Sequence, residues 1–179
     1  MPPLPRRPHA VASVSTAWLS LGSNVDAEAN LRSAIAALRA RFGPVRVSPA
    51  YRTPAVGFDG PAFLNAAAAI ETTLDVHALD AWLHALEDAH GRDRSQPRFS
   101  SRPLDVDIVL FDDLVLDGPG HLQLPRPDLR HAFVLRPLHD LAPDLRVPGD
   151  GRTLAALWAA LVASDPAAGG LARGPDLAG

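Results

Sequence analysis

Residues 105–111 read Asp-Val-Asp-Ile-Val-Leu-Phe, and this run constrains the fold more than any other part of the chain. Its alternation of residue types and its β-branched residues predict a strand. Side chains two positions apart on a strand share a face, so Asp105 and Asp107 point the same way. Val106, Ile108 and Leu110 then line the other face. The run therefore predicts a strand with an apolar face toward a core and two carboxylates on the opposite face.

Two adjacent carboxylates on a strand repel each other, and burying both is costly unless a cation compensates their charge. A pair of hard oxygen ligands suits Mg²⁺, which usually takes one or two carboxylates and completes its shell with water and phosphate oxygens. Asp105 and Asp107 are thus candidate metal ligands. The alternative is that the pair lies on the solvated face of a half-exposed strand, which is common without any metal.

A short polar segment bounded by Gly91 and Pro103 precedes this strand. Guanidinium groups are permanently charged and fork onto phosphate oxygens, so arginines beside the carboxylates indicate a combined phosphate and metal site. A polar segment bounded by a glycine and a proline is also expected to be mobile. The competing interpretation is a solvated basic loop. The arginines of this segment are Arg92, Arg94, Arg98 and Arg102.

The composition excludes several classes of function. The chain has 179 residues, 47% of them hydrophobic, which suffices for one well-filled domain. Its net charge of −3 and its lack of a long basic run disfavour a nucleic-acid surface. It has no cysteine, which excludes disulfides and thiolate sites and fits a reducing cytoplasm. All 17 basic residues are arginine, so a Walker-type lysine and a Schiff base are excluded.

The remaining patterns predict the other elements of the fold. No apolar run approaches the roughly 20 residues that span a bilayer. Strands are expected at residues 14–21, 45–52 and 63–71, and Pro49 indicates an edge or a bulge in the second of them. A turn at residues 22–24 is expected to lead into a first helix that ends before Gly43. Asp75 is expected to cap a second helix, and residues 153–162 are expected to form a last helix. Asp112-Asp113 is expected to turn the chain into a hairpin with residues 114–116. Residues 1–13 and 163–179 read as flexible tails around one domain at 14–162. Interleaved strands and helices of this kind predict an α+β sandwich.

Two further features concern binding. Alternation places Phe63 and Asn65 on one strand face, so a ring that can stack lies beside an amide that can donate and accept hydrogen bonds. A flat heterocycle with a polar edge needs that combination, although Phe63 in the core and Asn65 bonded to local backbone is the alternative. The histidines His77, His84 and His90 show no metal-ligand spacing and are expected at the surface or its boundary.

The run from Arg102 to Ile108 resembles the signature of the 6-hydroxymethyl-7,8-dihydropterin pyrophosphokinase family. Arg102, Leu104, Asp105, Asp107 and Ile108 fit that signature, and the Leu-Gly-Ser-Asn turn at 21–24 resembles the family's opening segment. Phe-Ser-Ser at 99–101 replaces the usual Trp-Gly-Pro. The resemblance covers roughly residues 14–162. It implies a ferredoxin-like antiparallel sheet with helices on both faces, a three-layer αβα sandwich.

The resemblance also implies a reaction and a set of site residues. The family transfers diphosphate from ATP to the hydroxymethyl group of the dihydropterin and releases AMP, using two Mg²⁺ ions. The implied catalytic residues are Arg92, Arg102, Asp105 and Asp107, of which Asp105 and Asp107 hold the metal. The implied ATP-binding residues are Glu87, Arg94, Arg98, Arg102, Ile108, Arg126, Arg130 and His131. The implied pterin-binding residues are Thr53, Pro54, Val56, Phe63, Asn65, Asp105 and Phe133, with Phe63 and Phe133 on either side of the pterin.

The late segment departs from the family pattern. Arg126 stands where most members have a histidine that meets ATP, and His121 stands at a usual arginine position. Either Arg130 or His131 takes the place of another ATP-binding arginine. These departures motivate an alternative, a non-catalytic homologue that binds pterin or nucleotide. A different Mg²⁺-dependent phosphotransferase or hydrolase is a second alternative. The expected protein is a cytoplasmic monomer without a nucleic-acid or membrane partner.

Overall fold

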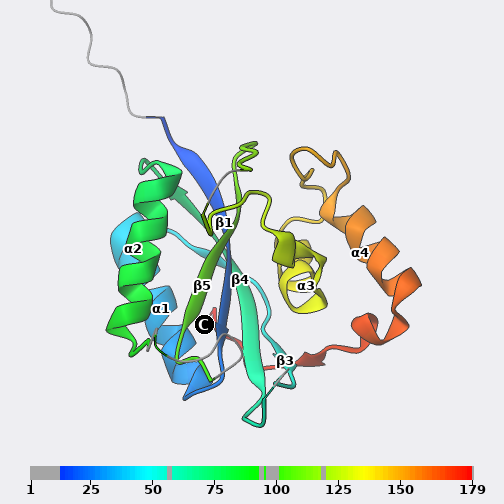
Figure 1. The fold of residues 1–179 in the computed structure, drawn as a ribbon, viewed down its shortest axis with the longest axis horizontal. Coiled ribbons are helices and arrows are strands. Elements are labelled where there is room, and N and C mark those ends of the chain that lie inside the picture. Colours follow the sequence, from blue (N-terminus) through cyan, green and yellow to red (C-terminus); the bar gives the residue numbers. More distant parts are fainter. Residues whose placement is uncertain (1–12, 56–57, 93–94, 96–100, 118–119, 179) are drawn as a thin grey trace, which may run out of the picture.

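The computed structural model describes residues 13–55, 58–92, 95, 101–117 and 120–178. Its centre is an antiparallel sheet with the strand order β5-β1-β4-β3-β6, in which β2 also pairs with β4 (Figure 1). The sequence-based expectation of a ferredoxin-like α+β sheet is confirmed. The strands are β1 (Ser15–Ser23), β2 (Arg46–Val47), β3 (Tyr51–Thr53), β4 (Phe63–Thr72), β5 (Asp105–Phe111) and β6 (Ala172–Arg173).

Helices cover both faces of the sheet, giving the expected three layers (Figure 1). One face packs on α1 (Ala27–Phe42) and α2 (Val76–Ala89), and the other on α3 (Ala132–Leu141) and α4 (Leu154–Ser164). Two 3₁₀ turns, η1 (Pro127–Arg130) and η2 (Pro166–Gly170), flank the second helix pair. Among the described residues no helix is both long and apolar enough to span a bilayer.

Each face of the sheet has its own apolar core. Leu19, Leu21 and Ile108 belong to the core under α1 and α2, whereas Trp18 and Ala67 belong to the core under α3 and α4. The alternation of side chains along β1 therefore separates the two cores. Asp75 caps α2 as expected, because its Oδ1 accepts a hydrogen bond of 2.7 Å from the amide of Ala78.

The expected strand at residues 45–52 is two short strands, β2 and β3, separated at Ser48-Pro49. Proline has no amide hydrogen, so the ladder is interrupted there. The Ser48 hydroxyl replaces a missing backbone acceptor by taking a 2.8 Å hydrogen bond from the amide of Ala67. The prediction of an edge or bulge at Pro49 was correct in kind.

Strand β5 contains an irregularity that the alternation did not predict. Leu19 pairs with Ile108 but Trp18 pairs with Leu110, so Val109 is an extra residue on β5. Leu110 consequently faces the α3 and α4 core, whereas Ile108 faces the α1 and α2 core. The expectation that Val106, Ile108 and Leu110 share one face was wrong at Leu110. The two aspartates precede the bulge and are unaffected.

The expected hairpin after β5 was also wrong. Asp112 turns the chain with φ of 48°, but Leu116 pairs with Leu124 rather than with β5. Asp112 instead accepts a 2.8 Å hydrogen bond at Oδ1 from the amide of Thr16. The segment from Leu114 to Leu124 packs through its leucines against the α1 and α2 core. Its leucines are therefore fully or partly buried by packing on the core, and they do not form a second strand beside β5.

The C-terminal residues differ most from the expectation of a flexible tail at 163–179. Within that segment, η2 is followed by β6, which pairs with β3. Leu177 is 2% exposed in the α1 and α2 core. The Arg32 guanidinium donates a 2.6 Å hydrogen bond to the carbonyl of Asp176. Composition pointed to a tail, but one buried leucine and the β6 pairing fix the segment.

Candidate active site

The register of the sheet places a row of residues side by side across four strands. Gly22 on β1 pairs with Asp105 on β5 and with Asn65 on β4, and Asn65 pairs with Tyr51 on β3. In the next row, Ser20 pairs with Asp107. Because these residues share the face toward α3, the carboxylates and Asn65 lie on one surface with only a glycine between them.

Gly22 lets the Asn65 side chain lie directly against the middle of this row. A Cβ at this position would lie 2.9 Å from Asn65 Oδ1 and 4.0 Å from Phe63 Cδ1. Real Cβ atoms do not approach an oxygen this closely without a displacement, so a side chain here would push on Asn65. Gly22 therefore forms the floor between the carboxylates and the amide. The sequence-based interpretation placed Gly22 in a turn, but it lies within β1.

Arginines contact both carboxylates of the Asp105–Asp107 pair. The Nη1 of Arg92 lies 2.7 Å from Asp105 Oδ1, and the Nη2 of Arg126 lies 3.5 Å from Asp107 Oδ1. The Nε of Arg126 also donates a 3.0 Å hydrogen bond to Asp128. The structure therefore brings together four residues from three segments of the chain. Arg126 reaches the carboxylates although it departs from the family pattern.

Glu87 lies behind this pair and is almost fully buried, at 3% exposed. Its Oε2 accepts a 3.0 Å hydrogen bond from the amide of Val106 and lies 4.0 Å from Arg92 Nη1. Burial raises the pKa of Glu87 from its ordinary 4.5 to about 7, and the nearby Asp105 and Asp107 add to this rise. The Val106 amide and Arg92 oppose it. Glu87 thus ties α2 to the edge of β5 at the site.

Burial also raises the pKa of Asp107, from its ordinary 3.8 to about 6, against the opposing charge of Arg126. The Asp105 and Asp128 carboxylates reinforce the rise. Because 33% of the Asp107 side chain is exposed, solvent moderates this effect. Burial therefore outweighs the stabilisation of the charged form by Arg126. Two partly exposed carboxylates on one face fit the hard oxygen donor set that Mg²⁺ prefers.

Asn24 fixes the chain that enters β5. Its side-chain Oδ1 accepts a 2.7 Å hydrogen bond from the backbone amide of Arg102, and its backbone amide donates a 3.1 Å hydrogen bond to the Arg102 carbonyl. Its Nδ2 donates to the carbonyl of Pro61 at 3.2 Å. Arg102 is 8% exposed. The turn after β1 therefore positions both the predicted catalytic arginine and the loop that precedes β4.

Asn65 and Phe63 share the same sheet face, as the alternation predicted. The Asn65 amide donates a 2.9 Å hydrogen bond to the hydroxyl of Thr53, so two predicted pterin-binding residues are in direct contact. The ring of Phe63 meets that of Phe58 edge-on, with centroids 6.4 Å apart. Pro54 follows Thr53 and is exposed. A polar edge and an aromatic ring thus lie together beyond Gly22.

Comparison with known proteins identifies the family. A sequence model described as 7,8-dihydro-6-hydroxymethylpterin-pyrophosphokinase (HPPK) matches residues 18–143. The chain belongs to the HPPK family. The match extends from β1 through α3 and so includes every described residue of the row across the sheet.

Curated relatives carry the corresponding name. The 2-amino-4-hydroxy-6-hydroxymethyldihydropteridine pyrophosphokinase of Pseudomonas aeruginosa is 42% identical over 154 residues, which are 82% of this chain and 92% of the relative. The protein of the same name from Methylorubrum extorquens is 40% identical over 143 residues, 76% of this chain and 89% of the relative.

A solved structure supports the fold. The Plasmodium falciparum HPPK-DHPS A437G chain, crystallised with SDX-DHP, superposes with a TM-score of 0.68 at 13% identity. The superposition covers 87% of this chain but 47% of that chain, so the present chain spans about half the length of this neighbour. At this identity the likeness concerns the fold alone.

The late HPPK segment is placed by η1 and α3. Arg130 is exposed, and His131 stands at the N-cap of α3. The ring of His131 stacks on Phe133, with centroids 5.1 Å apart and an interplanar angle of 7°. Phe133 also packs on the α3 and α4 core. Enclosure of a pterin between Phe63 and Phe133 stays a prediction.

Some predicted HPPK site residues do not join the cluster. The side chain of Ile108 is 1% exposed in the α1 and α2 core, so that side chain is directed away from the carboxylates. Val56, Arg94 and Arg98 lie outside the described residues. Gly22 and Asn24 are the site residues whose roles sequence reasoning missed. Continuing the β1 alternation for two more residues would have placed Gly22 on the face of Ser20.

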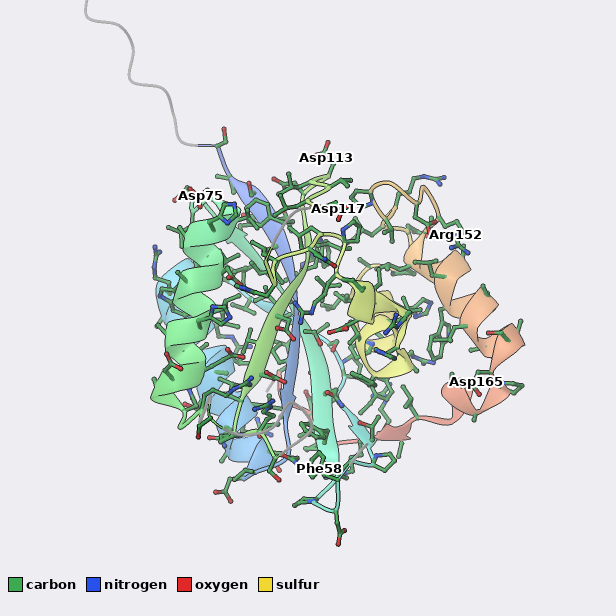
Figure 2. All side chains as sticks on the ribbon, in the orientation of Figure 1. Phe58, Asp75, Asp113, Asp117, Arg152 and Asp165 are labelled. Atoms are coloured by element: carbon green, nitrogen blue, oxygen red, sulfur yellow. The ribbon has the colours of Figure 1, made fainter. Side chains whose placement is uncertain are left out.

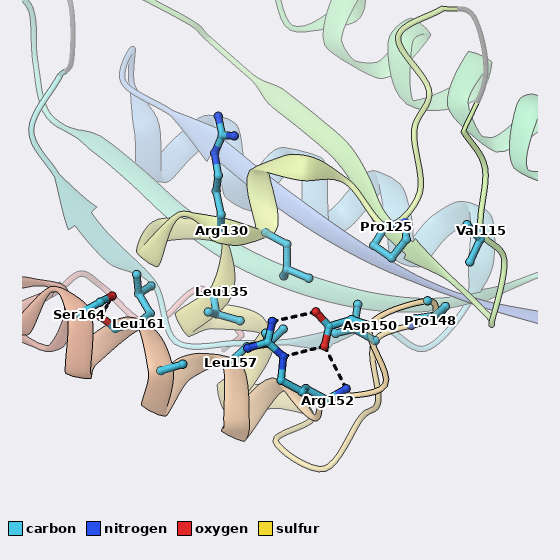
Figure 3. Close-up of a pocket in the computed structure, with 14 residues that line it drawn as sticks. Val115, Pro125, Arg130, Leu135, Pro148, Asp150, Arg152, Leu157, Leu161 and Ser164 are labelled. Atoms are coloured by element: carbon cyan, nitrogen blue, oxygen red, sulfur yellow. Dashed lines mark hydrogen bonds and ion pairs between the residues drawn. The ribbon is translucent and has the colours of Figure 1, made fainter.

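One cavity of the described structure lies away from the carboxylates. It has a volume of about 640 Å³ between α3, α4 and the loop at residues 147–152 (Figure 3). Leu135, Leu157 and Leu161 line it, and Asp150 and Arg152 pair with each other at 2.7 Å. Arg130 also lines the cavity, but in Figure 3 its guanidinium points away from Asp150 and Arg152. A largely apolar cavity with an internally paired charge does not suit a triphosphate.

Proposed function

We propose that this chain transfers diphosphate from ATP to 6-hydroxymethyl-7,8-dihydropterin and releases AMP, as a step of folate biosynthesis. The observation that carries the proposal is the row Asp105–Gly22–Asn65, because it sets a carboxylate pair beside a hydrogen-bonding amide on one sheet face. A site for phosphate and metal at the carboxylates would then lie next to a site for the heterocycle at Asn65. The hydroxymethyl oxygen attacks the β-phosphorus, the bond between that phosphorus and the oxygen bridging to the α-phosphorus breaks, and the hydroxyl proton is released.

Asp105 and Asp107 would hold Mg²⁺, and two ions fit the family resemblance. When bound, Mg²⁺ screens the phosphate charge and orients the attacking and leaving oxygens. The carboxylates suit this task because they lie on one face of one rigid strand and stay partly exposed between Arg92 and Arg126.

Arg92 and Arg102 would stabilise the charge of the transferred group. Arg94 and Arg98 would assist from the segment at residues 91–98, which in the resembled family closes over ATP. Arg92 is suited to this role because Glu87 and Asp105 hold its guanidinium at the site. Arg126, Arg130 and His131 would contact ATP. Positioning and electrostatics of this kind account for most catalysis of phosphoryl transfer.

Asn65 would read the polar edge of the pterin while Thr53 fixes its orientation through the 2.9 Å hydrogen bond. Pro54, Phe63 and Phe133 would supply the walls, with the rings stacking on the heterocycle. Gly22 would contribute by having no side chain, since even a methyl group would displace Asn65. The site would therefore separate the two substrates on either side of one glycine.

The test is to incubate the purified chain with ATP, Mg²⁺ and 6-hydroxymethyl-7,8-dihydropterin and to identify the adenine product. AMP formed only with the pterin present is the expected result. ADP or inorganic phosphate would indicate another phosphotransferase or a hydrolase. Folded protein that forms no product would favour the non-catalytic homologue, and ATP affinity in Mg²⁺ would then be measured.

A single substitution tests the assignment of Asp107 as a metal ligand. Asp107→Ala should abolish turnover in saturating Mg²⁺ while leaving the melting temperature nearly unchanged, because it removes a metal ligand and also relieves carboxylate repulsion. Wild-type turnover of this variant would rule out the role of Asp107. A cytoplasmic location and a monomeric state are part of the proposal and are checked by fractionation and by light scattering.

A further inference from the structure

A cluster of three possible metal ligands lies outside the proposed active site. Asp80 and His84 stand one turn apart on α2, and His121 comes from the segment between β5 and η1. The carboxylate and imidazole donor atoms of these residues all lie within 4.8 Å of one another. The sequence-based interpretation placed His84 at the surface or its boundary, because no metal-ligand spacing was evident; His121, which the fold brings to it, is far away in the chain.

Asp80 is the centre of the cluster. Its Oδ2 accepts a 2.8 Å hydrogen bond from His121 Nε2 and lies 3.6 Å from His84 Nδ1. The imidazole rings of His84 and His121 are tilted by 55° to each other, with centroids 5.0 Å apart. Ligand atoms of a tetrahedral zinc ion with bonds of about 2.0–2.1 Å lie roughly 3.3 Å apart, so the two Asp80 distances bracket this spacing.

The surroundings of the cluster favour a metal over an accidental contact. Leu122, the neighbour of His121, is buried in the same core as Leu79 and Leu83 of α2, so the backbone on both sides is fixed. The His121 side chain is 65% exposed and can turn its ring to close the remaining distance. Figure 2 shows Asp75 at the start of α2 and Asp117 before His121 at the same end of the molecule.

We propose that Asp80, His84 and His121 bind one zinc ion, with water at the fourth position. Two imidazoles and one carboxylate form a borderline donor set that suits Zn²⁺ and Co²⁺ better than Mg²⁺. The ion ties the segment that carries Arg126 to the helix that carries Glu87. Zinc bound here therefore stabilises the arrangement of two segments that meet at the carboxylate pair.

The experiment is calorimetric titration of the full chain, freed of any histidine tag and of chelator, with zinc chloride. Excess Mg²⁺ is kept present to occupy the carboxylate pair. We expect one zinc per chain. Asp80→Asn, His84→Ala and His121→Ala should each weaken binding at least about tenfold, since losing even an outer partner of a metal ligand costs this much.

The matched control is His77→Ala, which removes an exposed histidine from the first turn of α2 and should leave zinc affinity unchanged. Circular dichroism melts without zinc show whether each variant is folded. Co²⁺ provides a second readout, because a tetrahedral site gives intense visible absorption that His121→Ala should abolish.

Equal zinc affinity in wild type, His84→Ala and His121→Ala would overturn the proposal, as would an absence of zinc binding by folded wild-type protein. Zinc binding lost in Asp107→Asn but kept in His121→Ala would place the ion at the carboxylate pair and would also overturn it. These outcomes are independent of AMP formation, so failure here is distinguishable from failure of the proposed function.

Discussion

The substitution Gly22→Ala tests whether the open floor between Asp105 and Asn65 matters. The new Cβ would lie 2.9 Å from Asn65 Oδ1, whereas an ordinary carbon–oxygen contact is about 3.3–3.6 Å. Either β1 shifts or the Asn65 side chain moves. Movement of Asn65 strains its 2.9 Å hydrogen bond to Thr53. The perturbation is thus a displacement of about 0.5 Å at the atom that would read the pterin.

The expected loss of stability is modest because two effects oppose each other. Overpacking by one methyl group costs about 1–3 kcal/mol. Alanine in a strand interior is favoured over glycine by about 0.5–1 kcal/mol. The net destabilisation is about 1–2 kcal/mol, which corresponds to a fall in melting temperature of roughly 2–8 °C for a domain of this size.

The expected loss of activity is larger and specific to one substrate. A misplaced contact group can cost up to about 100-fold, so kcat/KM for the pterin should fall roughly 10- to 100-fold. The KM for ATP should change less than about twofold, since a tenfold change needs 1.4 kcal/mol and no ATP contact is altered. The assay is AMP formation with each substrate varied in turn. Gly170→Ala, where a Cβ would meet nothing within 4 Å, is the matched control.

A double mutant identifies the clash. Asn65→Ala removes the oxygen that the new methyl group would meet, so Gly22→Ala should cost no stability in that background. Two results would refute the reasoning. One is an unchanged kcat/KM for the pterin in Gly22→Ala. The other is an equal loss of melting temperature from Gly22→Ala with and without Asn65.

Three further predictions follow from the structure. In EDTA, the melting temperature of Asp107→Asn should rise relative to that of wild type as the pH increases from 4 to 6, and the difference should stay constant above pH 6. The reason is that a folded-state pKa of Asp107 raised from 3.8 to about 6 makes its ionisation unfavourable to folding in that window. A difference in melting temperature that does not change with pH would contradict the shift. Leu177→Ala should cost about 3 kcal/mol, or roughly 6–12 °C in thermal melts, whereas Val14→Ala, 61% exposed, should cost almost nothing. Arg92→Lys keeps the charge beside Asp105 but loses the guanidinium fork, so kcat for AMP formation should fall about 100-fold with KM for the pterin unchanged; a wild-type kcat would exclude a role in charge stabilisation.

Patterns within single elements were predictable from the sequence. The shared face of Asp105 and Asp107, the shared face of Phe63 and Asn65, and the Asp75 cap all depend on local periodicity or local hydrogen bonding. These features need no knowledge of what packs against the element. The signature resemblance then linked the local patterns to one family.

Features that depend on pairing between distant segments were not predictable. The bulge at Val109 exists because β1 and β5 pair with a shifted register. Helix α3 contains Pro137, which by local rules ends a helix, yet burial of Val134, Leu135 and Leu138 against the sheet outweighs that cost. In each case tertiary packing decided between local alternatives.

The edge of the sheet explains why fold and site are hard to separate in this chain. β5 is an outer strand, and such a strand presents backbone groups without a neighbouring strand. The Glu87 carboxylate accepts from the amide of Val106, and the amide of Arg126 donates to the carbonyl of Val109. The residues that satisfy this edge therefore also place charges beside the carboxylates. Substitution of Glu87 would therefore lower both stability and activity. Substitution of Asp107 would lower activity without lowering stability, because the buried charge of Asp107 destabilises the fold.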